Sequence, residues 1–493
     1  MYLDDLIGAV PARAALGGHP GLGGHPGLAI AGLTADSRAV APGWLFAALP
    51  GVKADGRTFI PAALKAGASA VLAPEGTALP PDTRAALVTA ANPRQAFARM
   101  AAAFAGAQPA TVVAVTGTNG KTSSVTFARQ IWDRLGRTAA SLGTLGAESG
   151  VYRRAGSMTT PDPVSLHKML AEMAEAGVDA LAMEASSHGL DQYRLDGVRL
   201  SAAAFTNLTR DHLDYHHTMD AYLAAKARLF GEVLGRGGVA VLNADDPAFP
   251  TLAGLCRDRG QSVLDYGRSA KALRLASVSA KAHGQTLELE LFGQHHDVLL
   301  PLVGDFQAMN VLCALGLALA TGAPVEAAVA TLASLEGVPG RLEMVARRAS
   351  GAPVYVDYAH TPDGLVTALH ALRPHCRGKL VCVFGCGGDR DRAKRPLMGR
   401  AVAEGADVAI LTDDNPRSED PAAIRAEARV GCPAAIEIDG RDAAIRAGVA
   451  LLGPNDLLVI AGKGHETGQT IGTVVHPFVD ADHARAAVEE ADA

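Results

Sequence analysis

The chain has 493 residues, 48% of them hydrophobic and 19% charged, an ordinary globular balance that argues against long disordered segments. This length exceeds what one hydrophobic core supports, so we expect about three domains. The formal net charge of -6 excludes the basic excess typical of nucleic-acid binders, and no nucleic-acid partner is expected. An anionic substrate is compatible with this charge, because local backbone amides and arginines can hold phosphate.

The cysteines and the apolar segments predict a cytoplasmic protein. None of the six cysteines forms a C-x-x-C pair, and the chain is too long for a disulfide scaffold, so free thiols are expected. Asp4 and Asp5 occupy positions where a signal peptide would be positively charged. The most apolar stretch, from Val311, is broken by Gly322 and Pro324 and is short for a membrane span. We therefore expect no membrane segment.

The first domain is predicted over residues 1–108 as a small α/β unit. Its strand-like pieces GWLFAAL and ASAVLA lie between Ala-rich helical segments, and GAQPA follows as a linker. Before them the segment LGGHPG occurs twice in a row, from Leu16 and from Leu22. We interpret it as a duplicated loop rather than a histidine metal site, because glycine and proline favour turns.

The second domain, predicted over residues 109–337, opens with a phosphate-binding pattern. TVVAV from Thr111 predicts a buried strand, which leads into GTNGKT and then into SSVTFARQIWDRLG, whose apolar positions recur at helical spacing. Strand, glycine loop and helix in this order form the phosphate-binding unit of an α/β sheet. Further strands at DALAMEAS, AAAFTNLT and GVAVLNADD alternate with helical segments, which indicates a mostly parallel sheet covered on both faces.

The turn GVPGR, from Gly337, marks the next domain boundary. The third domain is predicted over residues 338–493 and is expected to be Rossmann-like. Four apolar runs, PVYVDYAH, KLVCVFGCGG, DVAILTDDNPR and DLLVIAGKGHE, each end in glycines or charges. In an open α/β sheet the ligand crevice lies at the carboxyl ends of the strands, where these polar clusters fall. The predicted fold class is therefore α/β in three domains, with a P-loop ATPase-type, mostly parallel sheet at the centre.

The glycine loop is the strongest candidate site in the sequence. It reads Gly117-Thr118-Asn119-Gly120-Lys121-Thr122, with two residues between its glycines where the Walker A pattern has four. Glycines let backbone N–H groups approach phosphate, and the following helix offers its positive end. Lys121 is expected to reach the β- and γ-phosphates, and Thr122 to bind Mg²⁺. The alternative, a glycine turn before a helix, is disfavoured by the strand that precedes the loop.

Further motifs identify the chemistry. TGTNGKT, MEASSHGL, NLTRDHLDYH, DYAHTP and GCGGDRD occur in this order. With them the chain resembles the Mur ligase family over almost its whole length, most weakly in the first domain. The resemblance implies an ATP-dependent ligase of peptidoglycan synthesis that adds meso-diaminopimelate to a UDP-N-acetylmuramoyl dipeptide. In that family the γ-phosphoryl group of ATP moves to a substrate carboxylate, and an amine then attacks the acyl phosphate.

The resemblance also implies metal and ATP contacts. Glu184 and His212 are the implied Mg²⁺ ligands, and Lys226 is implied to be carbamylated by CO₂, which turns it into an anion that binds Mg²⁺. Taken alone, these three would be interpreted as a solvated strand-end Glu, a loop His and an exposed helical Lys. Contacts to ATP on its adenine and ribose side and across the domain hinge are implied for Asn310, Arg341 and Asp357.

Contacts to the nucleotide substrate are implied as well. The uridine-binding segment is implied to include Ala35, Ser37, Val52, Lys53 and Ala54. An ordinary capping or turn Ser is the alternative for Ser37. Hydroxyls and an arginine fork suit phosphate, and the muramoyl peptide with its diphosphate is implied to meet Thr159, Thr160, Ser186, Gln192 and Arg194.

The amino-acid substrate is implied to bind the third domain. Arg390 of GCGGDRD would hold its α-carboxylate, and Gly462 and Glu466 of AGKGHE would contact its distal end. The run Asp414-Asn415-Pro416-Arg417 matches the DNPR motif of diaminopimelate-adding members, in which the Arg meets the distal carboxylate. An Asn-Pro turn after a strand is a common construction, and both interpretations hold if the turn aims the Arg side chain.

Two other functions stay open at this point. A folylpolyglutamate synthase-like ligase with another amino-acid substrate shares the shortened phosphate loop, but the segment around Ser37, MEASSHGL and DNPR argue against it. A nucleotide switch without amide chemistry would leave Lys226, His212 and DYAHTP unexplained. The expected oligomeric state is a monomer.

Overall fold

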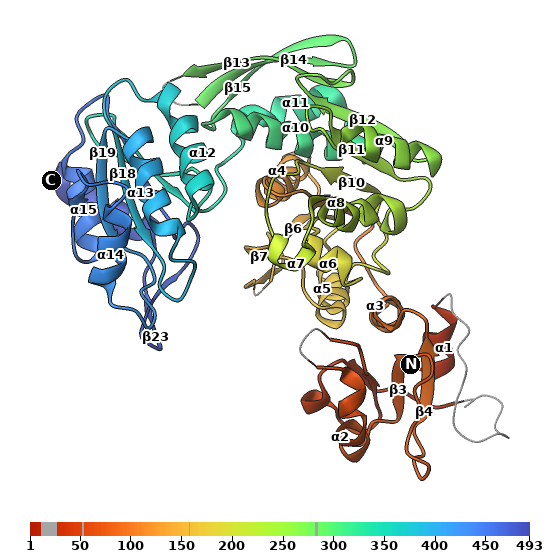
Figure 1. Cartoon of the computed structure of the whole chain (residues 1–493). Coiled ribbons are helices and arrows are strands. Elements are labelled where there is room, and N and C mark those ends of the chain that lie inside the picture. Colours follow the sequence, from red (N-terminus) through yellow and green to blue (C-terminus); the bar gives the residue numbers. More distant parts are fainter. Residues whose placement is uncertain (11–26, 52–53, 157, 282–283) are drawn as a thin grey trace. The chain divides into compact units, whose positions relative to one another are not determined.

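The computed structural model describes residues 1–10, 27–51, 54–156, 158–281 and 284–493 and divides into two compact units (Figure 1). The first unit comprises Met1–Lys271 and Cys313–Ala328, and the second comprises Ala272–Leu312 and Val329–Ala493. The duplicated LGGHPG segment lies, except for its last glycine, outside the described residues, as do Val52 and Lys53. The domain limits proposed at residues 108 and 337 stay predictions.

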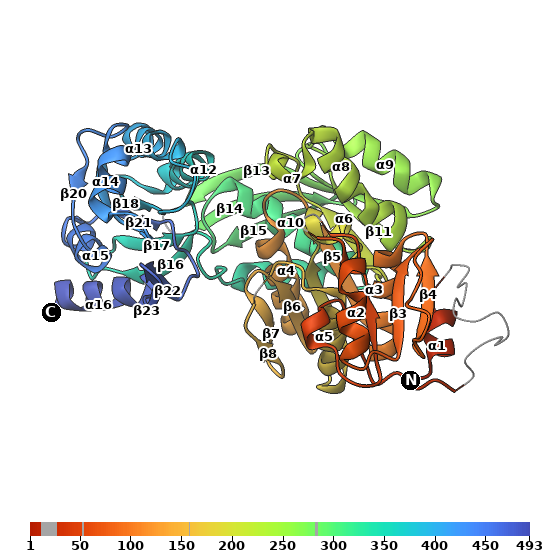
Figure 2. The ribbon, with the colours of Figure 1, turned by 60° about the horizontal axis from the view of Figure 1, so that its bottom comes forward.

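The amino-terminal part of the first unit is a parallel sheet with helices on both faces. Its elements are α1 (Leu3–Gly8), β1 (Gly32–Thr34), a 3₁₀ turn (Ser37–Ala39), β2 (Trp44–Ala47), a second 3₁₀ turn (Gly56–Phe59), α2 (Ile60–Lys65), β3 (Ala70–Pro74), β4 (Ala86–Ala90) and α3 (Pro93–Ala105). The strands lie in the order β1-β2-β3-β4. Leu45 and Leu72 pack with α1 and α3, whereas their chain neighbours Phe46 and Val71 pack with α2. Figure 2 accordingly shows α1 and α2 on either side of β3 and β4.

The central part of the first unit is built on the strand order β12-β11-β10-β5-β9-β6-β7-β8, parallel from β12 to β6 and antiparallel at β7 and β8. Since β5, β9 and β10 are parallel neighbours, the segments that follow their carboxyl ends meet at one edge of the sheet. The elements are β5 (Thr111–Thr116), α4 (Lys121–Arg134), β6 (Ala139–Gly143), β7 (Gly146–Ser149), β8 (Arg153–Arg154), α5 (Pro163–Glu175), β9 (Ala180–Glu184), α6 (Ser187–Asp191), β10 (Ala202–Phe205), α7 (Leu213–His216), α8 (Met219–Arg228), a π-helical turn (Leu229–Val233), β11 (Val239–Asn243), α9 (Phe249–Asp258) and β12 (Ser262–Gly267).

The second unit contains an antiparallel meander and a mostly parallel sheet. The meander is β13 (Leu273–Lys281), β14 (Gly284–Leu291) and β15 (Gln294–Leu300). The sheet has the order β16-β17-β21-β18-β19-β20, with β16 antiparallel to its neighbour. Its strands are β16 (Glu343–Arg347), β17 (Pro353–Asp357), β18 (Leu380–Cys386), β19 (Val408–Asp413), β20 (Ile436–Glu437) and β21 (Leu457–Ala461), and a hairpin of β22 (Gly468–Ile471) and β23 (Val474–Pro477) follows.

Helices cover both faces of the sheet in the second unit. Figure 2 shows α12, α13 and α14 on one face and α15 and α16 on the other. Side chains of the first three helices share one core with the strands, and those of the last two share another. The helices are α12 (Pro362–Leu372), a 3₁₀ turn (Arg373–His375), α13 (Lys394–Gly405), α14 (Pro421–Arg429), α15 (Arg441–Ala450) and α16 (Asp480–Asp492). Three further elements come before β16 in the chain: α10 (Asp305–Ala320), α11 (Val325–Thr331) and a 3₁₀ turn (Leu332–Ser334). Both α10 and α11 include residues of each unit.

The predicted fold class is confirmed. Large, mostly parallel sheets carry helices on both faces, and DYAHTP, GCGGDRD, DNPR and AGKGHE all lie at carboxyl ends of strands of one sheet. All six cysteines carry free thiols, as expected. Within the described ranges, none of the helices combines the length and the apolar character needed to cross a bilayer.

A buried ion pair joins α15 to α16. Arg441 Nε and Nη2 each donate to a carboxylate oxygen of Asp480 at 2.7 Å, and both side chains are 0% exposed. We expect Asp480→Ala to lower the free energy of unfolding by about 3–5 kcal/mol, because it leaves a buried guanidinium without its partner. Urea denaturation measures this loss. Asp482→Ala, which removes an exposed carboxylate from the same helix, should cost under about 1 kcal/mol, and equal losses in the two variants would contradict the assignment.

Candidate active site

The loop Gly117–Thr122 connects the carboxyl end of β5 to the first turn of α4. Gly117 has a φ of 147°, and a Cβ there would lie 1.8 Å from Thr206 Oγ1, so only glycine fits. The Thr118 amide donates to Asn207 O at 2.8 Å, which ties the loop to the segment after β10. The positive amino end of α4 therefore stands at a backbone loop of fixed shape, as an anion site requires.

Two lysines converge on one carbonyl oxygen of this loop. Lys121 Nζ donates to Gly117 O and Thr118 O, each at 2.9 Å, and Lys226 Nζ donates to Gly117 O at 2.8 Å. Lys226 is 1% exposed, and its Nζ lies 4.3 Å from the centre of the Tyr222 ring. Burial, and after it the nearby charge of Lys121, lowers the pKa of Lys226 to about 6. The interpretation of Lys226 as an exposed helical lysine is therefore wrong.

Glu184 ends β9 beside the loop and is 1% exposed. Its Oε1 accepts hydrogen bonds from Thr122 Oγ1 at 3.0 Å and from the Thr144 amide at 2.8 Å. A Cβ at Gly143 would lie 2.1 Å from the same oxygen, so the glycine makes room for the carboxylate. The interpretation of Glu184 as a solvated strand-end residue is therefore wrong.

The oxygen donors fit a Mg²⁺ ion held jointly with a nucleotide rather than by a protein cage. In the described part of the chain, no group of three or more His, Cys, Asp or Glu side chains is arranged to hold a metal. Mg²⁺ commonly uses one or two carboxylates together with substrate phosphates, and Thr122 and Glu184 supply such donors. His212 precedes α7, and its half-exposed ring lies 6.2 Å from the Tyr222 ring that covers Lys226.

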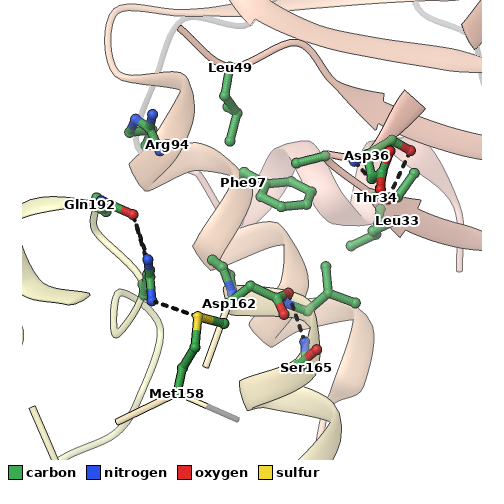
Figure 3. Close-up of a pocket in the computed structure, with 14 residues that line it drawn as sticks. Leu33, Thr34, Asp36, Leu49, Arg94, Phe97, Met158, Asp162, Ser165 and Gln192 are labelled. Carbon is green, nitrogen blue, oxygen red and sulfur yellow. Dashed lines mark hydrogen bonds between the residues drawn. The ribbon is translucent and has the colours of Figure 1, made fainter. Parts of the chain in front are cut away.

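A pocket of about 520 Å³ lies between the amino-terminal sheet and the central part of the first unit (Figure 3). The predicted contacts Ala35, Gln192 and Arg194 line it. The Arg194 guanidinium donates to Thr160 O and to Gln192 Oε1, both at 2.7 Å, so its direction is fixed from two sides. This is the arrangement expected of a preorganised anion contact.

The predicted hydroxyl residues lie between this pocket and Glu184. Thr160 Oγ1 donates to Glu184 O at 3.1 Å and accepts from the Ser186 amide and hydroxyl, each at 3.0 Å. Ser186 also caps α6 by accepting from the Gly189 amide at 3.0 Å. Thr159 Oγ1 lies 3.1 Å from the Thr144 hydroxyl, which in turn donates to the Glu184 carboxylate. One hydrogen-bonded cluster thus links the pocket side to the carboxylate.

Two further members of the predicted uridine-binding segment, Ser37 and Ala54, are described by the structure, and their role stays a prediction. Among the described residues, Ser37 and Ala54 do not line the pocket. Asp36, and not Ser37, caps the 3₁₀ turn by accepting from the Arg38 amide at 3.0 Å, so a capping role for Ser37 is wrong. Ala54 is exposed, and its carbonyl accepts from the Gly51 amide at 3.1 Å.

The second unit brings the predicted ATP contacts close together. Asn310 Nδ2 donates to Gln307 Oε1 at 3.0 Å, and Gln307 in turn donates to Arg341 O at 3.3 Å. Asp357 Oδ2 accepts from the Leu342 amide at 2.8 Å. Burial raises the pKa of Asp357, against the opposing charge of Arg341. The three predicted residues therefore belong to one hydrogen-bonded neighbourhood.

The predicted amino-acid contacts gather at the carboxyl ends of β18, β19 and β21. Arg417 has a φ of 55°, uncommon for a residue with a side chain, and its amide donates to Thr470 O at 3.0 Å. Its Nη1 donates to Gly388 O at 2.8 Å. A Cβ at Gly387 would lie 3.0 Å from this Nη1 and 3.8 Å from Arg390 Cγ, so the two arginines share one small region. Whether this turn aims the Arg417 side chain at an amino-acid substrate stays a prediction.

The remaining predicted residues pack around this turn. Gly462 has a φ of 119°, and a Cβ there would lie 2.5 Å from Asp414 Oδ2. Burial raises the pKa of Asp414, which the charges of Arg441 and Lys463 oppose. Pro416 is buried, and Asn415 donates through Nδ2 to Glu466 Oε2 at 2.9 Å.

Several residues of these sites were missed by the sequence analysis, among them an arginine, a phenylalanine and a buried lysine. Arg94 and Phe97 of α3 line the pocket, and Lys463 has a fully buried side chain beside Asn415 and Glu466. The signal for Lys463 was its place between two glycines of AGKGHE. No pattern distinguished Arg94 and Phe97 from other residues of an amphipathic helix.

The chain matches three models of known protein families. The model of the Mur ligase family, catalytic domain, matches residues 29–107. The Mur ligase middle domain matches residues 115–318, and the Mur ligase, glutamate ligase domain, matches residues 340–464. The three matches together span most of the chain.

Relatives match over nearly their full length. The UDP-N-acetylmuramoyl-L-alanyl-D-glutamate--2,6-diaminopimelate ligase of Caulobacter vibrioides is 54% identical over 473 residues, which are 94% of this chain and 96% of the relative. The protein of the same name from Bradyrhizobium diazoefficiens is 50% identical over 497 residues, 99% of each chain. A solved structure of a UDP-N-acetylmuramoyl-L-alanyl-D-glutamate--2,6-diaminopimelate ligase is 36% identical, with a TM-score of 0.71, and the match covers 94% of this chain and 95% of that one.

Proposed function

The chain belongs to the Mur ligase family, and we propose that it joins meso-diaminopimelate to UDP-N-acetylmuramoyl-L-alanyl-D-glutamate in an ATP-dependent amide ligation. The observation that carries the proposal is the convergence of Lys121, Lys226 and Glu184 on the glycine loop at one sheet edge. The full-length match to ligases named for this reaction supports these substrates. The product serves peptidoglycan synthesis, and a cytoplasmic monomer stays our prediction.

The reaction couples two bond exchanges. The D-glutamate carboxylate attacks the γ-phosphorus of ATP, an O–P bond forms, and ADP leaves. The diaminopimelate amine then attacks the acyl carbon, and phosphate leaves as the amide forms. Negative charge builds up at the γ-phosphate, where Lys121 and the amino end of α4 stabilise it. Mg²⁺, when bound, would offset further phosphate charge, with Thr122, Glu184, His212 and carbamylated Lys226 as its proposed protein ligands.

The two substrates are proposed to bind in different units. The pocket lined by Ala35, Gln192 and Arg194 suits the UDP-muramoyl part, because it combines apolar walls with a fixed guanidinium for phosphate. Arg390 and Arg417 are proposed to take the two carboxylates of diaminopimelate, and Glu466 its distal ammonium. Both ends of the amino acid then meet charges of opposite sign.

A ligation assay tests the proposal. The purified chain is incubated with UDP-N-acetylmuramoyl-L-alanyl-D-glutamate, ATP, Mg²⁺ and either diaminopimelate or lysine, and the product mass and ADP release are followed. A mass increase with diaminopimelate is expected. Ligation of glutamate to tetrahydrofolate instead would support the folylpolyglutamate synthase-like alternative, and ATP hydrolysis independent of any carboxylate substrate would support a nucleotide switch.

Arg417→Ala is expected to raise the KM for diaminopimelate while leaving the KM for ATP nearly unchanged. An arginine fork accepts the distal carboxylate through charge-assisted hydrogen bonds worth roughly 1.5–3 kcal/mol. At about 1.36 kcal/mol per tenfold, KM should rise on the order of tenfold to a few hundredfold. Arg417→Lys should restore only part of the loss, because a point charge lacks the fork. Steady-state kinetics with each substrate varied in turn measure these changes.

The matched control is Arg429→Ala, which removes a half-exposed guanidinium from α14 of the same unit. Its KM values should equal those of the wild type. Equal use of lysine and diaminopimelate by the wild type would contradict the role of Arg417 and leave the ligase assignment standing.

A further inference from the structure

Lys463 follows β21, and its side chain is 0% exposed. Its Nζ donates to Asn415 Oδ1 and to Glu466 Oε2, each at 3.1 Å. Asn415 Nδ2 closes this triangle by donating to the same Glu466 oxygen at 2.9 Å. A buried ammonium is costly unless it is paired and hydrogen-bonded, so these contacts fix the three side chains together.

The triangle leaves the two oxygens of Glu466 in different situations. Oε2 accepts from both Lys463 and Asn415, whereas no hydrogen bond to Oε1 is found among the described residues. The side chain is 35% exposed, so a ligand can reach the carboxylate. Burial by itself raises the pKa of Glu466, but the hydrogen bond from Asn415 and the charge of Lys463 outweigh it and lower that pKa. Glu466 is thus an anchored anion with one oxygen left for a cation.

The same triangle is connected to the turn that carries Arg417. Asn415 Oδ1, besides accepting from Lys463, accepts from the Thr470 amide at 2.9 Å. Thr470 O accepts from the Arg417 amide at 3.0 Å. Lys463 therefore lies at the junction of two short chains of hydrogen bonds, one that ends at the Glu466 carboxylate and one that ends at the Arg417 backbone.

We propose that Lys463 is a positioning residue for the amino-acid substrate: its buried ammonium holds Glu466 so that Oε1 accepts from the distal ammonium of diaminopimelate while Arg417 holds the distal carboxylate. The inference rests on the proposed function. Both distal groups sit on one carbon of diaminopimelate, so the carboxylate and the guanidinium must stand at a fixed separation. Lysine lacks the distal carboxylate, and 2-aminopimelate lacks the distal amine, so each can satisfy only one of the two.

Lys463→Met in the full chain tests the proposal, with kinetics on diaminopimelate and on 2-aminopimelate. The KM for diaminopimelate should rise about tenfold to a hundredfold, since Glu466 loses the donor that holds it. The KM values for 2-aminopimelate, ATP and the UDP-muramoyl dipeptide should change less than about twofold, because none of them uses the distal amine. In a Glu466→Gln background, Lys463→Met should add less than about twofold.

The matched control is Lys379→Met, which removes an exposed lysine from the same unit and should leave every KM unchanged. A parallel rise for diaminopimelate and 2-aminopimelate would reduce Lys463 to a structural residue, and an unchanged KM for diaminopimelate would also overturn the proposal. If Lys463→Met does not fold, Lys463→Arg is used instead, because it keeps the positive charge but changes the length of the side chain. Equal changes in the KM for diaminopimelate and for 2-aminopimelate would then refute the positioning role. A wild type that does not ligate diaminopimelate would refute the proposed function as well.

Discussion

Lys121→Ala is expected to lower the rate of ligation on the order of a thousandfold or more. The Lys121 ammonium stands at the first turn of α4, 2.9 Å from two carbonyl oxygens of the glycine loop, where the β- and γ-phosphates are proposed to bind. Phosphoryl transfer needs little covalent help from the protein and depends on neutralising the charge of the transferred group. Removing that cation therefore raises the barrier of the first chemical step. ADP release and product formation under saturating substrates measure the loss.

The control for this prediction is Lys168→Ala, which removes a largely exposed lysine from α5 of the same unit. That variant should turn over at the wild-type rate. Circular dichroism of Lys121→Ala should match that of the wild type, which separates lost chemistry from lost folding. Near-normal turnover of Lys121→Ala would exclude the glycine loop as the phosphate site.

The strand, glycine loop and helix of the proposed phosphate site could be predicted from sequence because they are contiguous in the chain. TVVAV and SSVTFARQIWDRLG predicted a strand and a helix around GTNGKT, and the structure has β5 at Thr111–Thr116 and α4 at Lys121–Arg134. The periods of the two patterns differ, so the switch from strand to helix is visible in a single window of residues. Likewise, strand-end motifs predicted the sheet edge of the second unit, since parallel strands collect their carboxyl ends on one side.

Burial of charged residues could not be predicted in this way. Lys226 lies in an Ala-rich helix that reads as exposed, and its burial depends on Gly117, which is 109 residues away in the chain. Lys463 lies in a glycine-rich loop and is buried against Asn415, 48 residues away. Local periodicity reports one face of one element and carries no information about which distant segment packs on it.

The antiparallel meander β13–β15 had a signal that the sequence analysis did not use. LELEL in the second of these strands alternates apolar and charged residues at a period of two, and Leu287, Leu289 and Leu291 are all 0% exposed. Such alternation is typical of a strand with one buried face. The expectation of a mainly parallel sheet was drawn from the longer apolar runs, which are buried on both faces and stand out more clearly.

The structure gives Lys226 the properties that carbamylation requires. The reaction forms an N–C bond between a neutral amine and CO₂ and releases one proton, so a protonated lysine cannot take part. With the pKa of Lys226 lowered to about 6, the neutral amine dominates near pH 7. Lys121 Nζ donates to the same Gly117 O as Lys226 Nζ, so a carbamate on Lys226 would place a negative charge close to the Lys121 ammonium. Ligation should therefore decline as the pH falls through about 6, where this amine becomes protonated.

Lys226→Ala is accordingly expected to lose ligation activity on the order of a hundredfold or more, because the proposed anionic ligand disappears from beside the phosphate loop. Short carboxylic acids such as formate or acetate, added at high concentration, should restore part of the activity, since they can place a carboxylate in the space left by the side chain. Mass spectrometry of the intact wild type should show the added CO₂, and Lys168→Ala again serves as the control for removal of a lysine outside the site. An unmodified lysine together with no rescue by any short acid would contradict the metal-ligand role of Lys226, which would then be withdrawn.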